Sequence, residues 1–397
     1  MSGSRKAATY EALGVSPHKP DVHSAIADLD RGLFPGAFCQ VFPDRITGDP
    51  ASCVVMHADG TGTKSLIAYL HWKETGDPSY FRGAAMDALA MNIDDMICVG
   101  ATGPFYVSNT IGRNLKLIDG SVIREIIHGY SHAATTLAAH GVSIIATGGE
   151  TADLGDLVRT VVIDCTAFAR VRRDTVIDAR GVRPGDAIVG LSSTGRAVYE
   201  SAENSGIGTN GLTAARHQLL AAEYAGRYPE TFDPSIKVHA FRGDCRLSDP
   251  VPGSEMTVAE ALSSPTRTYS PIVAAMPRDL LADVSAMFHN TGGGLTKCLR
   301  FGSGIRYVKD SLLAMPPIFS LIHARAGVPL REMCRVYNMG HRLEVVVRPE
   351  RAGEVIAISR RFGVEAAIVG RTERSATPAN ELVVRCEGQT VEFAAGE

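Results

Sequence analysis

Clusters of glycine beside predicted strands are the feature that most constrains how this chain can fold. The 397 residues include 40 glycines, about 10% of the chain against a usual share of about 7%. Glycine is favoured where the backbone takes a positive φ or passes close to another group. The surplus lies in segments that we expect to be ligand loops, at Gly32, Gly36, Gly60, Gly62, Gly148, Gly149, Gly208, Gly211, Gly292, Gly293 and Gly294.

One such segment, Asp59-Gly60-Thr61-Gly62-Thr63-Lys64, follows a predicted strand over 53–57 and precedes a predicted helix through Trp72. Its small residues let backbone amides approach an anion, its threonines add hydroxyls, and its lysine neutralises phosphate charge. The segment matches neither the Walker A loop nor the G-x-G-x-x-G fingerprint. Phosphate binding and a tight turn between strand and helix both remain open for this segment alone.

Two acidic segments follow in the first half. Asp87, Asp94 and Asp95 fall in or near a predicted apolar helix over 87–99, and residues 148–153 (Gly-Gly-Glu-Thr-Ala-Asp) are predicted to turn sharply after a strand over 142–146. Carboxylates among apolar residues need a partner, and Mg²⁺ prefers oxygen ligands beside phosphates. Solvent-facing acids, a helix cap and a solvated turn are the structural alternatives.

The second half contains the matching glycine loops, Thr209-Asn210-Gly211 and 290–294 (Asn-Thr-Gly-Gly-Gly). Three successive glycines lose much backbone entropy on folding, so they indicate a backbone surface for a phosphate or a sugar. His289 precedes the second loop and could donate a proton or a hydrogen bond. A purely structural role for this histidine stays open.

Composition excludes several classes of protein. Hydrophobic residues make up 45% and charged residues 21%, as in ordinary globular chains. A net charge of −3 gives no electrostatic footprint for nucleic acid or a membrane surface. The eight cysteines contain no C-x-x-C pair, which predicts free buried thiols. With no apolar stretch of about 18 residues and no signal peptide, we expect a cytoplasmic protein without membrane or nucleic-acid partners.

The predicted elements divide into two domains, 1–170 and 171–397, at the polar, turn-rich stretch 170–186. Within the second domain, residues 225–265 include five prolines and predict a long surface excursion. A helix over 121–140, capped by Ser121, is the clearest single element. Strands and helices alternate without βαβ regularity, so the sequence predicts an α+β fold with two layered domains.

Taken in order, these segments resemble the phosphoribosylformylglycinamidine cyclo-ligases. That family belongs to an ATP-binding superfamily with thiamine-monophosphate kinases, selenophosphate synthetases and a hydrogenase-maturation protein. Its D-G-V-G-T-K, D-L-V-A-M…N-D-L and G-G-E-T-A-E patterns correspond to residues 59–64, 87–96 and 148–153, with Asp94 in place of the asparagine. Its S-S-G, S-N-G-Y-S, P-T-R-I-Y, H-L-T-G-G-G and Y-R-T-F-N-x-G patterns correspond to residues 192–195, 209–213, 265–269, 289–294 and 334–340.

The resemblance implies ATP-dependent closure of formylglycinamidine ribonucleotide to 5-aminoimidazole ribonucleotide in purine biosynthesis. The γ-phosphate would pass to the formyl amide oxygen, and the amidine-side nitrogen would then attack that carbon. The implied architecture is a homodimer whose N-terminal mixed sheets, with their helices, pack into a barrel, each followed by a C-terminal α/β sandwich domain. The first domain would bind ATP and Mg²⁺ and form the dimer, and the second would bind the ribonucleotide.

The resemblance also assigns residues to these roles. The implied catalytic residues are Lys64, Asp95 and His289. ATP would be bound by Asp59, Gly60, Thr61, Gly62, Thr63, Lys64, Asp87, Gly149 and Glu150. Mg²⁺ would be bound by Asp59, Asp87, Asp95 and Glu150. The substrate would be bound by Ser193, Asn210, Gly211, Arg267, His289, Thr291, Gly292, Gly293 and Asn338.

Three departures from the family pattern accompany the match. The N-terminal glycine loop is reduced to residues 32–38, and the segment between Gly195 and Thr209 is longer than in the family. The proline-rich excursion over 225–265 is also longer than in the family. Another ATP-using member of the superfamily, either a small-molecule kinase or a maturation protein, is one alternative function. A non-catalytic nucleotide-binding regulator is the alternative from a different class.

Overall fold

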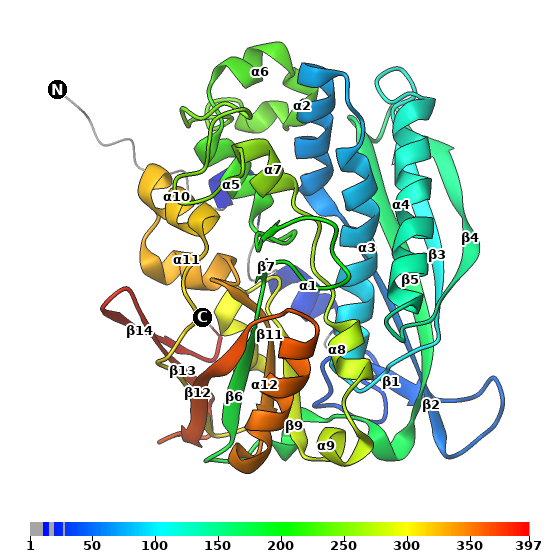
Figure 1. Ribbon diagram of the computed structural model, residues 1–397, viewed down its shortest axis with the longest axis vertical. Coiled ribbons are helices and arrows are strands. Elements are labelled where there is room, and N and C mark those ends of the chain that lie inside the picture. The colour runs from blue at the N-terminus through cyan, green and yellow to red at the C-terminus, as the bar shows by residue number, and fades with distance from the viewer. Residues whose placement is uncertain (1–10, 16–19, 27, 397) are drawn as a thin grey trace.

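Five strands of the first half form one mixed sheet in the computed structural model, which describes residues 11–15, 20–26 and 28–396 (Figure 1). Neighbouring strands are antiparallel except β3 and β4, which are parallel. Alternate residues of the sheet are buried, so one face packs against helices and the other faces outward. In spatial order the strands are β1 (Val41–Pro43), β2 (Ser52–Gly60), β5 (Val161–Arg172), β3 (Phe105–Arg113) and β4 (Ile144–Asp153).

Helices cover the inner face of this sheet. They are α2 (Ser65–Thr75), α3 (Tyr80–Ile97) and α4 (Gly120–Ala138). Helix α3 lies between the sheet and the second half of the chain (Figure 1), and it is buried on nearly every side, which explains its apolar residues all round. The N-cap of α4 is Asp119, whose side chain accepts hydrogen bonds from the backbone amides of Ser121 and Val122, so the expected Ser121 cap was wrong by two residues.

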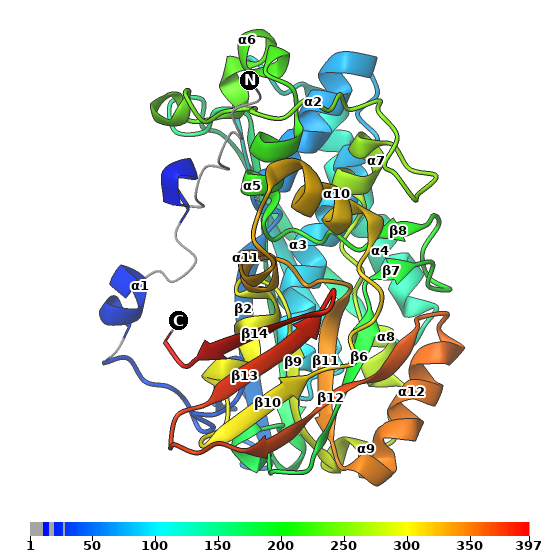
Figure 2. The same cartoon turned by 90° about the vertical axis from the view of Figure 1, so that its left-hand side faces the viewer.

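Seven strands of the second half form another mixed sheet, seen in Figure 2. Every residue of β11 is buried, as expected of a central strand covered on both faces. A short hairpin, β7 (Thr194–Gly195) with β8 (Asn204–Ser205), stands apart from this sheet. In spatial order the seven strands are β14 (Gln389–Ala394), β13 (Glu381–Cys386), β10 (Ile305–Lys309), β12 (Ala366–Arg374), β6 (Ala187–Ser192), β11 (His341–Val347) and β9 (Val284–His289).

The helices of the second half are mostly short. Helix α5 carries the first glycine loop at its N-terminus, and the 3₁₀ helix η7 (Gly294–Arg300) follows the second loop. The others are α6 (Glu223–Arg227), α7 (Val258–Ser263), α8 (Ser270–Ala274), α9 (Arg278–Ala282), α10 (Pro317–Ala326), α11 (Leu330–Val336) and α12 (Ala352–Arg361), with α5 spanning Leu212–Leu219. In the first half, α1 (Pro20–Ala25) precedes the sheet, and η2 (Gly62–Lys64) leads into α2.

Two structural expectations need correction. Residues 148–153, expected to form a sharp turn, continue β4 as an edge strand paired with β3. The excursion over 225–265 is not a plain surface loop, because Phe232, Phe241 and Leu262 are buried in the second hydrophobic core. The α+β class is confirmed, and all eight cysteines are free thiols.

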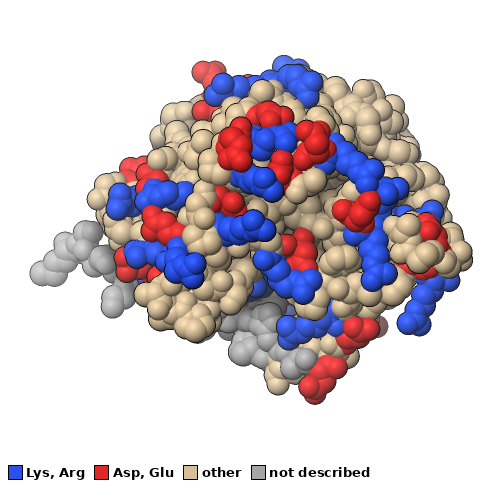
Figure 3. Space-filling model, turned by 90° about the horizontal axis from the view of Figure 1, so that it is seen from below, with Lys and Arg blue, Asp and Glu red and all other residues tan. Residues whose placement is uncertain are grey.

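The surface and the helix lengths agree with the composition. Positive and negative side chains intermingle on the face shown in Figure 3. Arg351 exemplifies this mixing, because it pairs with Asp279, Asp283 and Glu354. Among the helices that the structure describes, none combines the length and the apolar composition needed to cross a bilayer.

Candidate functional site

Helix α3 carries a carboxylate that links the two halves of the chain. Asp87 Oδ1 accepts hydrogen bonds from Lys64 Nζ at 2.8 Å and from the Thr266 amide at 2.7 Å. Lys64 also donates to the Ser264 carbonyl and is only 3% exposed. The ammonium expected to bind phosphate is therefore directed into an interface between the two halves, where a protein carboxylate and a carbonyl take its hydrogen bonds.

A second carboxylate on α3, Asp94, is also bound by the second half. Its oxygens accept hydrogen bonds from Thr268 Oγ1 at 2.5 Å and from the Tyr269 amide at 3.2 Å. Burial raises the pKa of Asp94 to about 7, although Arg342, 4.0 Å away, opposes the shift. Asp94 is therefore a second point at which α3 is hydrogen-bonded to the second half.

The third carboxylate, Asp95, joins two histidines. Its Oδ1 lies 2.6 Å from His289 Nδ1 and its Oδ2 lies 3.2 Å from His57 Nε2. Burial alone would raise the pKa of Asp95, but the hydrogen bonds from the histidines hold it well below its usual range. Asp95 is thus a partly buried anion at the centre of the site.

His289 is fixed in one neutral form. Arg342 donates from Nε and Nη2 to His289 Nε2 at 3.0 and 2.6 Å, so the ring proton resides on Nδ1 and points to Asp95. Burial and the nearby guanidinium lower the pKa of His289 to about 4. The expected proton donor is therefore a neutral imidazole that orients Asp95.

His57 is the charged member of the pair, and no motif in the sequence pointed to it. Its Nδ1 lies 3.2 Å from Asn92 Oδ1, and the amide oxygen faces the ring because Asn92 Nδ2 donates to the backbone carbonyls of Asp59, Ala88 and Cys165. An amide oxygen only accepts, so His57 donates from both nitrogens and is an imidazolium. Burial lowers the pKa of His57, but the hydrogen bond and charge of Asp95 outweigh this effect and raise it overall.

Asp59 and Glu150, the two remaining candidate metal ligands, lie on opposite faces of the first sheet. Across neighbouring strands Gly60 pairs with Asp164, Asp164 with Thr110, and Thr110 with Glu150. Paired residues share a face, so Glu150 lies on the face of Gly60, opposite to that of Asp59. Three strand spacings also separate them by about 14 Å.

The carboxylate cage expected for Mg²⁺ is therefore not assembled within one chain. Asp87 and Asp95 are engaged by protein cations, while Asp59 and Glu150 lie on opposite faces of the sheet. In the part of the chain that the structure describes, no three His, Cys, Asp or Glu side chains converge to hold a metal ion. These residues do not fit a resident four-carboxylate site.

The glycine loops of the two halves do come together. Thr63 Oγ1, in the 59–64 segment, lies 2.9 Å from Thr213 Oγ1 at the start of α5. A Cβ on Gly292 would lie 3.6 Å from Asn210 Nδ2, so the two loops of the second half are neighbours. Gly211 has a φ of 77°, and a Cβ there would meet the ring of Tyr337 at 2.3 Å.

The other loop residues have mixed surroundings. Thr61 is buried and donates to the Ala84 carbonyl at 2.6 Å, while Gly62 takes a φ of 58° with open space around its Cα. Thr291 is buried and contacts the His289 carbonyl at 3.4 Å, and Gly293 has a φ of 98°. Gly149 packs against the Asn109 side chain on the edge strand, away from these loops.

Ser193, Arg267 and Asn338 were expected to bind the substrate, but their polar groups form hydrogen bonds within the protein. Arg267 pairs with Glu200 at 2.5 Å and donates to the carbonyls of Ser192, Thr194 and Gly195. Asn338 accepts from Ser193 Oγ at 3.0 Å and donates to the Gly206 carbonyl at 2.8 Å. These buried side chains fix the 192–206 segment, and their polar groups are used by the protein.

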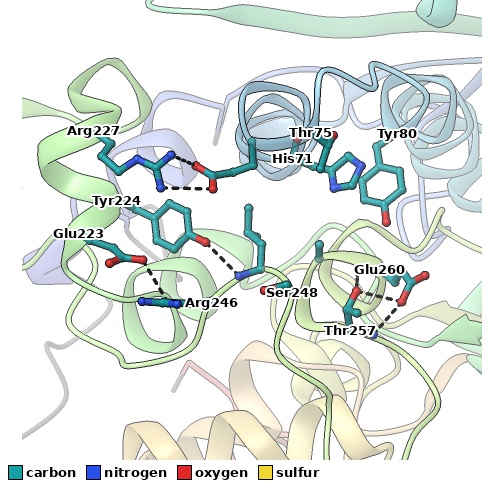
Figure 4. Close-up of a pocket in the computed structure, with 13 residues that line it drawn as sticks. His71, Thr75, Tyr80, Glu223, Tyr224, Arg227, Arg246, Ser248, Thr257 and Glu260 are labelled. Atoms are coloured by element: carbon teal, nitrogen blue, oxygen red, sulfur yellow. Dashed lines mark hydrogen bonds and ion pairs between the residues drawn. The ribbon is translucent and has the colours of Figure 1, made fainter.

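A cavity of about 590 Å³ lies elsewhere, between α2 and the excursion (Figure 4). Four of its charged side chains form two ion pairs, Arg227 with Glu74 at 2.7 Å and Arg246 with Glu223 at 3.4 Å. None of the expected site residues lines it. The loops around Asp95 therefore remain the candidate site.

Comparisons with known proteins match both halves of the chain to one family. The family model for the N-terminal domain of AIR synthase related protein matches residues 39–171, and that for its C-terminal domain matches residues 183–379. A phosphoribosylformylglycinamidine cyclo-ligase of Methanocaldococcus jannaschii is 31% identical, over 80% of this chain and 77% of its own. One from Pyrococcus furiosus is 34% identical, over 77% of this chain and 75% of its own.

Solved structures show the same fold at lower identity. The ADP complex of Thermotoga maritima PurL is 15% identical with a TM-score of 0.56, over 97% of this chain. This chain spans about half the length of that PurL chain, since the match covers 50% of it. A hydrogenase maturation protein, HypE, is 16% identical with a TM-score of 0.52, over 87% of this chain and 89% of its own. From the two domain models and the curated relatives, the chain belongs to the AIR synthase related family.

Proposed function

We propose that this chain catalyses the ATP-dependent cyclisation of formylglycinamidine ribonucleotide to 5-aminoimidazole ribonucleotide, ADP and phosphate. Curated relatives with the cyclo-ligase name cover most of the chain at about 30% identity. The observation that carries the proposal is the meeting of the 59–64 segment with the 209–213 and 290–294 loops beside Asp95. Ligand segments from both halves of the chain at one charged centre suit a nucleotide that must transfer a group to a second substrate.

In this reaction the formyl amide oxygen takes the γ-phosphoryl group of ATP and ADP leaves. The amidine-side nitrogen then attacks the formyl carbon, loses a proton, and the phosphorylated oxygen departs as phosphate. Such transfer depends mainly on positioning and on neutralising charge. Asp95 holds the His57 imidazolium toward the centre, Arg342 fixes His289, and the loop amides at Gly292 and Gly293 offer donors to an anion.

ATP is the proposed phosphoryl donor, and a PurL structure with this fold was solved with ADP. Mg²⁺ enters the proposal as the ion that accompanies ATP, held largely by phosphate oxygens and water as is usual for this ion. The four carboxylates first expected to bind it do not fit a resident cage, so no step depends on their binding a metal ion.

A homodimer formed through the first sheet is part of the proposal. Its outer face carries an apolar row in which Met56 pairs with Phe168, Phe168 with Tyr106, and Tyr106 with Ile145. Met56 is 65% exposed and Tyr106 is 43% exposed, although both are large and apolar. A row of this kind is typical of a surface that a second subunit covers.

The purified protein, given ATP with and without the ribonucleotide, tests the proposed function. We expect ADP and aminoimidazole ribonucleotide in equal amounts, and ADP formation that requires the ribonucleotide. Transfer of phosphate to a stable product without ring closure would indicate a superfamily kinase instead. Absence of ATP turnover with every substrate offered would favour the non-catalytic regulator.

The Asp95→Asn substitution tests the charged centre. We expect a loss of kcat of about 100-fold or more, because the amide cannot hold His57 as an imidazolium or accept from both histidines. The surface substitution Asp279→Asn, at a side chain that is 73% exposed, is the matched control and should retain full activity. Wild-type turnover by Asp95→Asn would contradict the assigned role.

A further inference from the structure

Lys297 lies at the charged centre, although no motif pointed to it. It belongs to η7, which directly follows the glycine loop, and its side chain is half-buried. Its charge interacts with those of Asp95 and Asp59 across the two halves of the chain, and it contributes to the low pKa of His289. Lys297 Nζ lies over the Phe38 ring, and the residue after Phe38, Cys39, contacts the Asp95 carbonyl through Sγ at 3.5 Å, so the ammonium lies beside the charged centre.

The hydrogen-bonding capacity of this ammonium is unused. Among the described residues, Lys297 Nζ has neither a hydrogen-bond acceptor nor an ion-pair partner, and it lies over the face of the Phe38 ring, 5.6 Å from the ring centroid. Burial lowers the pKa of Lys297 in spite of the opposing effect of Asp95. An ammonium whose three N–H donors are taken by no protein group is available to a ligand that enters the site.

The two fully buried lysines nearby provide a contrast. Lys64 is bound by Asp87 and by the Ser264 carbonyl. Lys309 lies 2.8 Å from Glu344 and donates to the Leu295 carbonyl at 2.7 Å. Both ammonium groups are occupied by the protein, whereas that of Lys297 is not.

We propose that Lys297, and not Lys64, is the ammonium that binds a phosphoryl group at this site. This inference rests on the proposed function, because the phosphoryl group belongs either to ATP or to the ribonucleotide 5′-phosphate. Lys297 follows Gly292 and Gly293 by only a few residues, so their backbone amides and its ammonium can act on the same anion. The cation–π contact with Phe38 holds the lysine stem without using its N–H donors.

Three variants test the proposal, Lys297→Met, Lys297→Arg and the control Arg300→Met, whose arginine is exposed on the same helix. Calorimetry of the full chain measures Kd for ATP and for the ribonucleotide separately, alongside kcat, KM and Tm. We expect Lys297→Met to weaken one ligand about tenfold or more, the usual effect of losing a charged hydrogen bond. Lys297→Arg should keep that Kd within about threefold, and Arg300→Met should match the wild type.

The ligand that weakens identifies the source of the phosphoryl group. A selective loss for ATP assigns Lys297 to the nucleotide, and a selective loss for the ribonucleotide assigns it to the 5′-phosphate. Unchanged Kd values for both ligands would overturn the proposal. So would a loss that Lys297→Arg fails to rescue and that accompanies a lower Tm, because this pattern indicates packing on Phe38.

The binding measurement also separates this inference from the proposed function. A wild-type protein that binds ATP but forms no cyclised product contradicts the cyclo-ligase assignment, while the comparison of Kd values still decides the role of Lys297. Lys64→Met provides the opposite pattern. It should lower Tm through its unpaired Asp87 partner, and it should not weaken one ligand selectively.

Discussion

Arg267 was expected to bind substrate, and its surroundings give it a different role. The side chain is 3% exposed and its donors meet Glu200 and three backbone carbonyls. A polar residue type in a motif predicts that hydrogen bonds exist, but it does not predict whether a ligand or the backbone accepts them. Asn338 and Lys64 follow the same pattern.

Arg267→Met should therefore act on stability. We expect a loss of about 3 kcal/mol in the free energy of unfolding, because Glu200 would remain in place without its cation. Urea denaturation measures the loss, and the double substitution Arg267→Met with Glu200→Gln should recover part of it. A variant with wild-type stability and a raised KM for the ribonucleotide would restore the substrate-binding role.

The buried His217 leads to a prediction for how stability depends on pH. Burial and the adjacent Arg216 lower the pKa of His217 to about 3, and the ring is 1% exposed. In the unfolded chain this histidine binds a proton near pH 6.5, whereas in the folded protein the ring stays neutral until about pH 3. The free energy of unfolding therefore falls as the pH drops from about 6.5 toward 3. The slope from this group is about 1.4 kcal/mol per pH unit.

Denaturation of the wild type and His217→Gln at pH 6.5, 5.5 and 4.5 measures this contribution. Other titrating groups are common to both proteins, so the difference between their slopes isolates one proton. Equal slopes would show that the buried ring is protonated in the native state.

Local sequence patterns predicted some secondary-structure elements well and others poorly. The apolar runs at 187–191 and 343–347 predicted β6 and β11 closely, since each is a buried β-branched strand. The prediction failed at 148–153 because glycines favour a turn locally, whereas the pairing of β4 with β3 extends the strand. Tertiary pairing of this kind has no signal in a short window of sequence.

One added carbon atom at Gly211, at the start of α5, should destabilise the fold. Gly211→Ala would place a Cβ against Tyr337 at a φ of 77°, so we expect a loss of about 2 kcal/mol or more and weaker ribonucleotide binding. Gly226→Ala in α6 is the matched control, because a Cβ there meets nothing within 4 Å. Thermal unfolding that is the same for both variants would mean that the loop before α5 relaxes freely.

At the scale of the whole molecule, the order of the motifs along the sequence predicted the family, but it did not predict which residues are in contact. The motif series gave the family, and with it Asp95, His289 and the two ligand loops. The charged centre depends on contacts over long separations, such as His289 with Asp95, 194 residues apart. His57 and Lys297 belong to no quoted motif, so only the folded arrangement brings them into the site.

The proposed dimer is tested by two charge substitutions. Tyr106→Glu places a carboxylate in the apolar row on the outer face of the first sheet, and we expect it to convert the dimer to monomers. Val238→Glu, at a residue in the excursion that is 66% exposed, should leave the dimer intact. Sedimentation velocity at equal concentrations gives both masses, and a monomeric wild type would contradict the proposal.

The three carboxylates of α3 have a consequence for how ligands enter. Asp87 is held by the Thr266 amide, Asp94 by Thr268 and Asp95 by His289, all from the second half. A hinge that opened between the halves would break these three contacts, and it would leave Asp87 only with Lys64 and Asp95 only with His57. We therefore expect the halves to stay docked through every turnover. Substrate entry and product release then depend on loop motion, and a peptide bond cut within residues 176–186 should leave two fragments that remain associated.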